Sequence, residues 1–237
     1  MEQEYTLTRD PVFYLTAAFF ALLTTGLPAV LGQPRFMPLV QAVVLAIFFT
    51  IPLRRQHLAG ALAVVLIWLV VSMMTIMTLT WLAPLQIERA FENGFFHRAA
   101  FSEWYFAGTP LPAGFEKQPV PRLVEILGIT LGSLLTAGVV GAWFLMRMAN
   151  LAAFSAGHLV SSLGGPLLLP VALPVWSVLQ IAGAAGLMVL LAEPLFARFA
   201  VVAVFRRRRR PLLIFGALYV AGLLAELLLA GLWHFHS

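Results

Sequence analysis

Apolar residues in this chain gather into runs long enough to cross a lipid bilayer, separated by short polar or charged turns. A transmembrane helix needs about 20 consecutive, mostly apolar residues. The sequence therefore predicts an all-α polytopic transmembrane helix bundle that forms a single integral membrane domain over 1–237. We predict seven spans: Pro11–Leu31, Phe36–Leu53, Leu58–Ala83, Leu123–Met146, Leu151–Leu169, Val175–Phe196 and Pro211–Trp233.

The stretch from Asn150 to Phe196 allows two arrangements, because glycines and prolines interrupt its apolar run. Two spans with a turn near Pro170–Pro174 fit it, as does a re-entrant segment followed by one span, which gives six spans in all. We prefer two spans, because an even number of crossings keeps Arg147 and the later arginine block on one side of the membrane.

Composition agrees with a membrane protein. Hydrophobic residues make up 61% of the 237 residues and charged residues only 11%, against about 25% charged in a typical soluble domain. The chain has no cysteine, which excludes disulfides, thiolate metal sites and cysteine nucleophiles. No phosphate-binding glycine loop with a lysine is present, so the chain is not itself expected to be an ATPase.

Five consecutive arginines, Arg206–Arg210, fix the expected orientation. Basic loops stay on the cytoplasmic side of a membrane, and the seven-span arrangement puts ten of the fifteen Lys and Arg residues there. The N-terminus is then cytoplasmic and the C-terminus extracytoplasmic. Arginine outnumbers lysine 14 to 1, which favours a GC-rich bacterial source and therefore a bacterial inner membrane.

The longest polar stretch, 84–122, is predicted to be an extracytoplasmic loop. Apolar and charged residues alternate at helical spacing from Leu85 to Phe106, which indicates an amphipathic helix in the membrane interface, with a possible break at Asn93-Gly94. Gly108 to Pro121 is rich in proline and indicates an irregular strap. The helix either caps the bundle or forms a lid over a laterally open cavity for a lipid or quinone-like molecule.

Polar residues inside predicted spans are candidates for function, because ionisable groups are costly in a membrane. Glu226 is the clearest, and Gln180 is expected at a similar depth and within hydrogen-bonding reach. His158 is expected nearer the inner face and able to join them only through water or a helix tilt. Glu226, Gln180 and His158 are therefore the candidate substrate-binding residues. The alternative is that a neutral Glu226 simply links helices or pairs with a partner subunit.

Charged residues at the ends of predicted spans are expected to reach water or lipid headgroups. These are Glu125, Glu193, Arg122 and Arg147.

Small residues recur every fourth position in three predicted spans, which favours close helix packing. The stripes place these spans in the bundle interior or at a subunit interface. They comprise Gly128, Gly132 and Thr136, then Ala182 and Gly186, and then Ala217, Ala221 and Ala225.

The sequence favours a non-catalytic membrane subunit or scaffold of a larger complex. The first alternative is a permease, or a permease subunit, that moves a small or lipid-like molecule, and the second is a membrane enzyme that handles a lipid or quinone. We identify no catalytic residue, no metal site and no indication of a cofactor. The expected partners are membrane lipids and other membrane subunits or further copies of the chain, and not nucleic acid.

Overall fold

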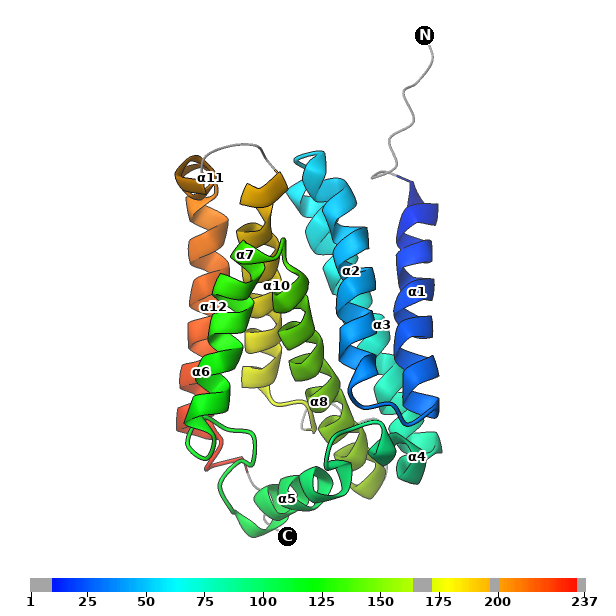
Figure 1. Cartoon of the computed structure of the whole chain (residues 1–237). Coiled ribbons are helices and arrows are strands. Elements are labelled where there is room, and N and C mark those ends of the chain that lie inside the picture. The colour runs from blue at the N-terminus through cyan, green and yellow to red at the C-terminus, as the bar shows by residue number, and fades with distance from the viewer. Residues whose placement is uncertain (1–9, 164–171, 197–200, 234–237) are drawn as a thin grey trace.

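The computed structural model describes residues 10–163, 172–196 and 201–233, and every regular element among them is a helix. Six helices are long and apolar enough to cross a membrane and stand side by side as a bundle (Figure 1). They are α1 (Pro11–Val30), α2 (Phe36–Arg54), α3 (Leu58–Leu82), α8 (Val139–Leu163), α10 (Val175–Phe196) and α12 (Arg209–Leu229). The predicted all-α, multi-pass architecture is confirmed.

Shorter helices complete the chain. They are α4 (Pro84–Arg89), α5 (Gly94–Ala107), α6 (Pro119–Leu127), the π-helix η2 (Gly128–Gly132), α7 (Ser133–Leu135) and α11 (Val201–Arg207). Helix α5 lies across one end of the bundle (Figure 1), which we call the cap end. The opposite end carries Arg54, Arg55 and Arg206–Arg210, and we call it the arginine end.

The predicted span Leu123–Met146 is not one helix. The segment α6–η2–α7 runs from the cap end toward the arginine end, and the chain then turns back into α8 (Figure 1). Ala137 and Gly138 have φ values of 56° and 88° at the turn, in the left-handed region that ends helices. The apolar run therefore folds into a helical hairpin.

Close packing explains why the chain turns here. A Cβ added at Gly138 would lie 2.6 Å from Phe49 Cζ and 3.1 Å from Ala192 Cβ, so only glycine fits. The Thr136 hydroxyl accepts a 3.0 Å hydrogen bond from Val140 N–H at the start of α8. Because the backbone N–H groups of Thr136, Gly138 and Val139 are hydrogen-bonded to carbonyl groups of the same turn, irregular backbone is tolerated within an apolar region.

The hairpin moves the next helix relative to the prediction. Helix α8 covers 139–163 where Leu151–Leu169 was expected, so its start is twelve residues earlier. The prolines and glycines at 164–170 that were expected to interrupt the chain lie outside the described residues. Six helices of the described residues are long and apolar enough to be membrane spans, and α6–η2–α7 lies beside them as a shorter helical segment.

The small-residue stripes pack helices together, but not always as predicted. A Cβ at Gly128 would collide with the Phe144 ring, so this glycine lets α6–η2–α7 lie against α8. A Cβ added at Gly186 would collide with the Phe215 ring in the same way, so this glycine lets α10 and α12 pack closely. Of the two places expected for the last span, the interior does not fit, because only 17% of the apolar window of α12 is buried; a place at a subunit interface stays a prediction.

The cap end matches the predicted loop in outline. Asn93 has φ 55° and separates α4 from α5, so the expected break at Asn93-Gly94 is confirmed. Trp104 and Tyr105 are buried, whereas Phe95 and Phe96 are exposed. No helix forms between Gly108 and Gln118, as expected for the proline-rich strap, although α6 begins at Pro119, before the predicted span.

The arginine end holds a buried ion pair that the sequence did not predict. Glu193 was expected to reach water, and this is wrong, because its side chain is 3% exposed. Arg208 binds it through two nitrogens, with N–O distances of 2.9 to 3.1 Å. The pair holds the last turn of α10 against the start of α12.

Candidate functional site

Glu226 and Gln180 face each other across the α10–α12 contact. Gln180 Nε2 donates a 2.8 Å hydrogen bond to Glu226 Oε2, and both residues are buried. The hydrogen bond and the shared depth expected from the sequence are confirmed.

Two further donors approach the Glu226 carboxylate. Arg122 Nη2, from α6, lies 2.7 Å from Oε2, and the Phe115 backbone N–H lies 2.8 Å from Oε1. A buried carboxylate is tolerated when it is paired and hydrogen-bonded. Glu226 therefore joins α6, α10, α12 and the strap in one polar cluster, which we call the Glu226 cluster: Glu226, Gln180, Arg122, Glu125 and Phe115 N–H.

Arg122 serves two carboxylates at once. Its Nη1 lies 2.9 Å from Glu125 Oε2 while its Nη2 binds Glu226, and the Arg122 and Glu125 side chains are 14% and 15% exposed. One guanidinium thus faces two carboxylates. The buried Arg122 Nε–H has no acceptor among the described residues. Arg122 was expected only to reach headgroups at a span end, and the structure instead places it at the centre of the cluster.

His158 does not join the Glu226 cluster. It was expected nearer the inner face, but α8 starts earlier and runs toward the cap end, so His158 lies near the cap end instead. Its Nε2 is 3.8 Å from Glu88 Oε1 of α4, and Arg98 of α5 pairs with the same carboxylate. His158 thus belongs to a separate contact that joins α8 to the cap helices.

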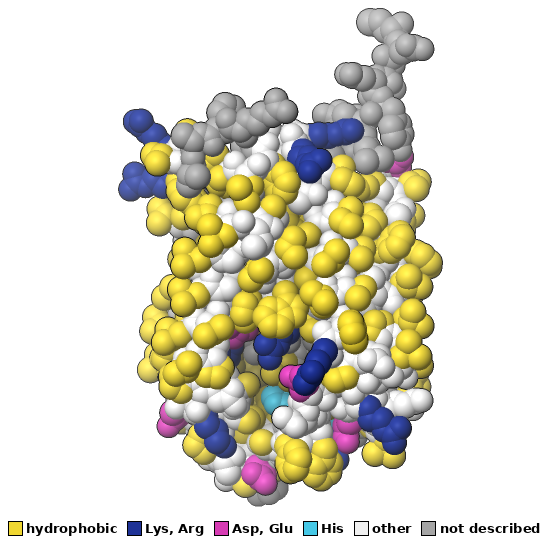
Figure 2. Space-filling view, in the orientation of Figure 1, with side chains coloured by type: hydrophobic (Ala, Val, Ile, Leu, Met, Phe, Trp, Pro, Cys, Tyr) yellow, Lys and Arg dark blue, Asp and Glu magenta, His cyan; other side chains and the backbone are white. Residues whose placement is uncertain are grey.

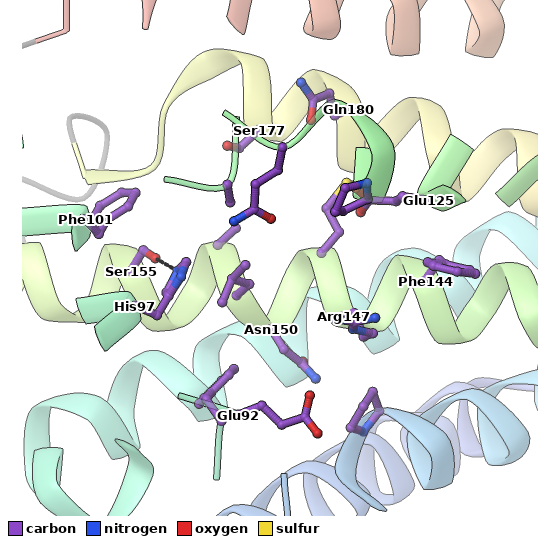
Figure 3. A pocket seen from close by; sticks show the side chains of 18 of the residues that line it. Glu92, His97, Phe101, Glu125, Phe144, Arg147, Asn150, Ser155, Ser177 and Gln180 are labelled. Atoms are coloured by element: carbon purple, nitrogen blue, oxygen red, sulfur yellow. Dashed lines mark hydrogen bonds between the residues drawn. The ribbon is translucent and has the colours of Figure 1, made fainter. Parts of the chain in front are cut away.

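A cavity of about 270 Å³ lies beside the Glu226 cluster, in the cap-end half of the bundle. Glu125 and Gln180 form part of one wall, and Arg147 and Asn150 of α8 form part of another (Figure 3). Arg122, which is bonded to Glu125, also lines the cavity. The rest is lined mostly by apolar residues of α2, α5, α6, α8 and α10 and of the segments between helices. In Figure 2 a hollow in the apolar side of the bundle exposes basic, acidic and histidine side chains, so the cavity opens laterally.

Arg147 is the least expected residue of this cavity. It was predicted to mark the cytoplasmic end of a span, and this is wrong: it lies eight residues into α8, about 12 Å along the helix axis from Val139. Its guanidinium lies 5.1 Å from the centre of the Trp143 ring and within 4 Å of no carboxylate among the described residues. Its side chain is exposed, and the residue is one of those that line the cavity.

A ladder of buried amide and hydroxyl groups holds the α8 wall in place. Asn150 Nδ2 donates a 2.7 Å hydrogen bond to Gln41 Oε1 of α2. Gln41 Nε2 donates to Thr25 Oγ1 of α1 at 2.6 Å, and Thr25 donates to Ser72 of α3 at 3.0 Å. Four helices are linked, so the position of Asn150, and of Arg147 one turn away, is set by polar contacts within the bundle.

His97 of α5 and Ser155 of α8 meet at the cap side of the cavity. The His97 Nε2 to Ser155 Oγ distance is 3.3 Å (Figure 3). Burial lowers the pKa of His97 to about 4, because a desolvated imidazolium loses its hydration. His97 is therefore neutral near pH 7. No group of three His, Cys, Asp or Glu residues able to hold a metal occurs among the described residues.

The sequence showed some of these residues but not how they come together. Gln41 and Asn150 are amides within apolar runs, a signal that polar contacts lie inside the bundle. Arg147 looked like a span-end residue because the hairpin turn was not recognised. Arg122 and His97 looked like span-end and loop residues because no local pattern shows how α6 and α5 lie against the bundle. No protein-family model matches this chain, and no curated protein or solved structure matches it. We therefore interpret the site from its geometry.

Proposed function

We propose that this protein is a permease, or a permease subunit, that takes up the polar headgroup of a lipid-like molecule into the laterally open cavity. The single observation that carries this proposal is Arg147, a guanidinium that has no ionic partner among the described residues, lies inside a candidate membrane span and lines the cavity. Charged groups within spans usually face a water-filled cavity or a substrate path.

The shape of the site supports an amphiphilic ligand. Small-molecule sites usually enclose about 300–1,000 Å³, so a cavity of about 270 Å³ fits a headgroup better than a whole lipid. The apolar surface around the opening leaves acyl chains in contact with the membrane. A cavity that combines charged and apolar lining residues is the complement of such a molecule.

The scaffold function favoured by the sequence explains this cavity less well. A scaffold works through its outer surfaces and gains nothing from a cavity lined by charged groups, which are costly to keep in a membrane. The association with other membrane subunits, or with further copies of the chain, stays a prediction. The exposed side of α12 is available for such contacts.

The Ser155–His97 contact favours a second candidate function, an enzyme that acts on an ester of the same lipid-like ligand. A hydroxyl beside a neutral imidazole is the arrangement used by serine nucleophiles. A fluorophosphonate probe tests it, because such probes label activated serines. The expected result for an enzyme is labelling of the wild type and loss of labelling in Ser155→Ala, whereas an unlabelled wild type excludes this candidate.

The arginine end is proposed to face the cytoplasm, in a bacterial inner membrane. Seven described arginines lie at that end, Arg54, Arg55 and Arg206–Arg210, in accordance with the positive-inside rule. The cavity then lies in the outer half of the membrane, the N-terminus is cytoplasmic and the C-terminus extracytoplasmic. Reporters fused to the two ends test this, and the same compartment for both would contradict it.

Lipid binding to the purified full-length protein tests the proposed function. Native mass spectrometry with phospholipids of defined headgroup gives the affinity of the wild type and of Arg147→Gln, which we expect to bind about tenfold more weakly. Arg89→Gln is the matched control, because Arg89 is exposed at the cap end and lies outside the cavity. Equal affinities for the wild type and Arg147→Gln would contradict the proposal.

Filling the cavity provides an independent test. Ala152→Phe adds a ring at a residue that lines the cavity, whereas Ala217→Phe adds one to the exposed side of α12. We expect only Ala152→Phe to exclude lipid. Lipid binding that survives Ala152→Phe would place the lipid elsewhere on the protein.

A further inference from the structure

The charges around the cavity are separated between two walls. Glu125 and Glu226 share the single guanidinium of Arg122, so the wall formed by the Glu226 cluster has one carboxylate more than it has cations. Arg147 on the α8 wall has no carboxylate within 4 Å among the described residues. One wall therefore carries a surplus negative charge, and the other a surplus positive charge.

The remaining charges near the cavity do not alter this separation. Glu92 lines the rim and is paired with Arg35, at 3.0 Å. His97 lines the cap side and is neutral near pH 7. Glu88 pairs with Arg98 and lies outside the cavity. The cavity as a whole is thus close to neutral but strongly dipolar.

From this separation we infer that the cavity selects a zwitterionic headgroup, with its phosphate at Arg147 and its ammonium group at Glu125. This inference rests on the proposed function and names the class of ligand. A guanidinium binds phosphate oxygens through its fixed pattern of N–H donors, and Glu125 lines the cavity where an ammonium group can reach it.

An anionic headgroup compensates the surplus charge of only one wall. Its phosphate can bind Arg147, but a hydroxyl in place of the ammonium leaves the surplus carboxylate without a cation. A charge without a counter-charge inside a membrane protein is costly. A purely cationic headgroup meets the opposite problem at Arg147. A molecule that carries both charges is the one that compensates both walls.

Two phospholipids with the same acyl chains distinguish these cases. Phosphatidylethanolamine carries an ammonium group, whereas phosphatidylglycerol carries hydroxyls at the same place. We expect the wild type to bind phosphatidylethanolamine about tenfold more tightly, as one additional charge-assisted contact would give. Glu125→Gln should remove this preference by weakening only phosphatidylethanolamine, and Arg147→Gln should weaken both lipids.

Changing the lipid headgroup tests the same contact between the ammonium group and Glu125 without changing the protein. N-acetylated phosphatidylethanolamine keeps the phosphate and loses the ammonium charge, so the wild type should bind it about as weakly as phosphatidylglycerol. This result remains available if Glu125→Gln fails to fold.

The outcomes separate the two proposals. Equal binding of phosphatidylethanolamine and phosphatidylglycerol by the wild type, or unchanged binding after N-acetylation, would overturn the zwitterion inference and leave a lipid site intact. Binding of both lipids that is unaffected by Ala152→Phe would instead overturn the lipid cavity itself.

Discussion

Arg122 and Glu226 are separated by 104 residues in the sequence and form a 2.7 Å ion pair between α6 and α12. The pair is unequal, because Arg122 has a second carboxylate, Glu125, whereas Arg122 is the only cation bound to Glu226 among the described residues. This asymmetry determines what each substitution leaves behind.

Arg122→Gln is expected to destabilise the protein more than Glu226→Gln. Loss of Arg122 leaves two carboxylates without a cation, which typically costs about 3–5 kcal/mol for a buried pair. Glu226→Gln leaves Arg122 paired with Glu125 and keeps a carbonyl for the Gln180 amide, so we expect about 1–2 kcal/mol. Thermal unfolding in detergent measures the difference, with the exposed Arg89→Gln as control. Equal losses would show that the two carboxylates are not coupled through Arg122.

The turn between α7 and α8 depends on one glycine. We expect Gly138→Ala to cost about 2–4 kcal/mol, because its φ of 88° is unfavourable for alanine and the added Cβ meets Phe49. Gly26→Ala is the control, since the nearest atom to its Cβ would be Thr75 Cγ2 at an ordinary 3.8 Å. The unfolding midpoints of the two variants test this, and similar midpoints would mean that the turn relaxes without cost.

The same turn limited what the sequence could predict. Hydropathy identified α1, α2, α3, α10 and α12 closely, because polar residues mark their ends. It did not find Gly138, since apolar residues continue through the turn and a helix-breaking glycine looks like one more member of a small-residue stripe. Once that turn was missed, Arg147 was assigned to a membrane surface instead of the interior.

The Glu226–Gln180 contact was predictable for a different reason. Both residues are isolated polar groups in otherwise apolar helices, and each is counted from a well-marked helix end. The same counting misplaced His158, because no polar residue marks the start of its helix, α8. Contacts such as His97 with Ser155 depend on how α5 lies across the bundle, which no local pattern specifies.

The Asn150–Gln41 hydrogen bond is expected to show coupling in a double-mutant cycle. Each single change to leucine leaves a buried amide without its partner, at about 1–3 kcal/mol, whereas the double change leaves neither. The double variant should therefore lose less than the two single losses combined, by about 0.5–1.5 kcal/mol. Thermal unfolding of the four proteins measures this. Additive losses would mean that water or Thr25 replaces the missing partner.

His97 is expected to make stability depend on pH. Its folded pKa of about 4 lies below the ordinary value of 6.5 because burial disfavours the imidazolium, so the unfolded chain binds more protons between those values. The contribution of His97 to the free energy of unfolding is then fully present above pH 6.5. It is lost as the pH drops toward 4, by at most about 3 kcal/mol. Unfolding midpoints of the wild type and His97→Gln across this range provide the test. An identical pH slope in both would assign the effect to other groups.

Gly222→Ala should connect helix packing to the ligand site. A Cβ at Gly222 would lie 2.7 Å from Gln180 Cγ, 2.8 Å from Gln180 N and 3.0 Å from Trp176 O, and the two backbone atoms cannot rotate away. Helix α12 must therefore move from α10, which stretches the bond between Gln180 and Glu226. We expect a loss of about 1–3 kcal/mol in stability and a weaker preference for phosphatidylethanolamine.

Gly216→Ala on the same helix has nothing within 4 Å of its Cβ and should change neither quantity. If Gly222→Ala lowers stability but leaves lipid selectivity unchanged, the charge arrangement at Glu125 does not depend on the position of α12.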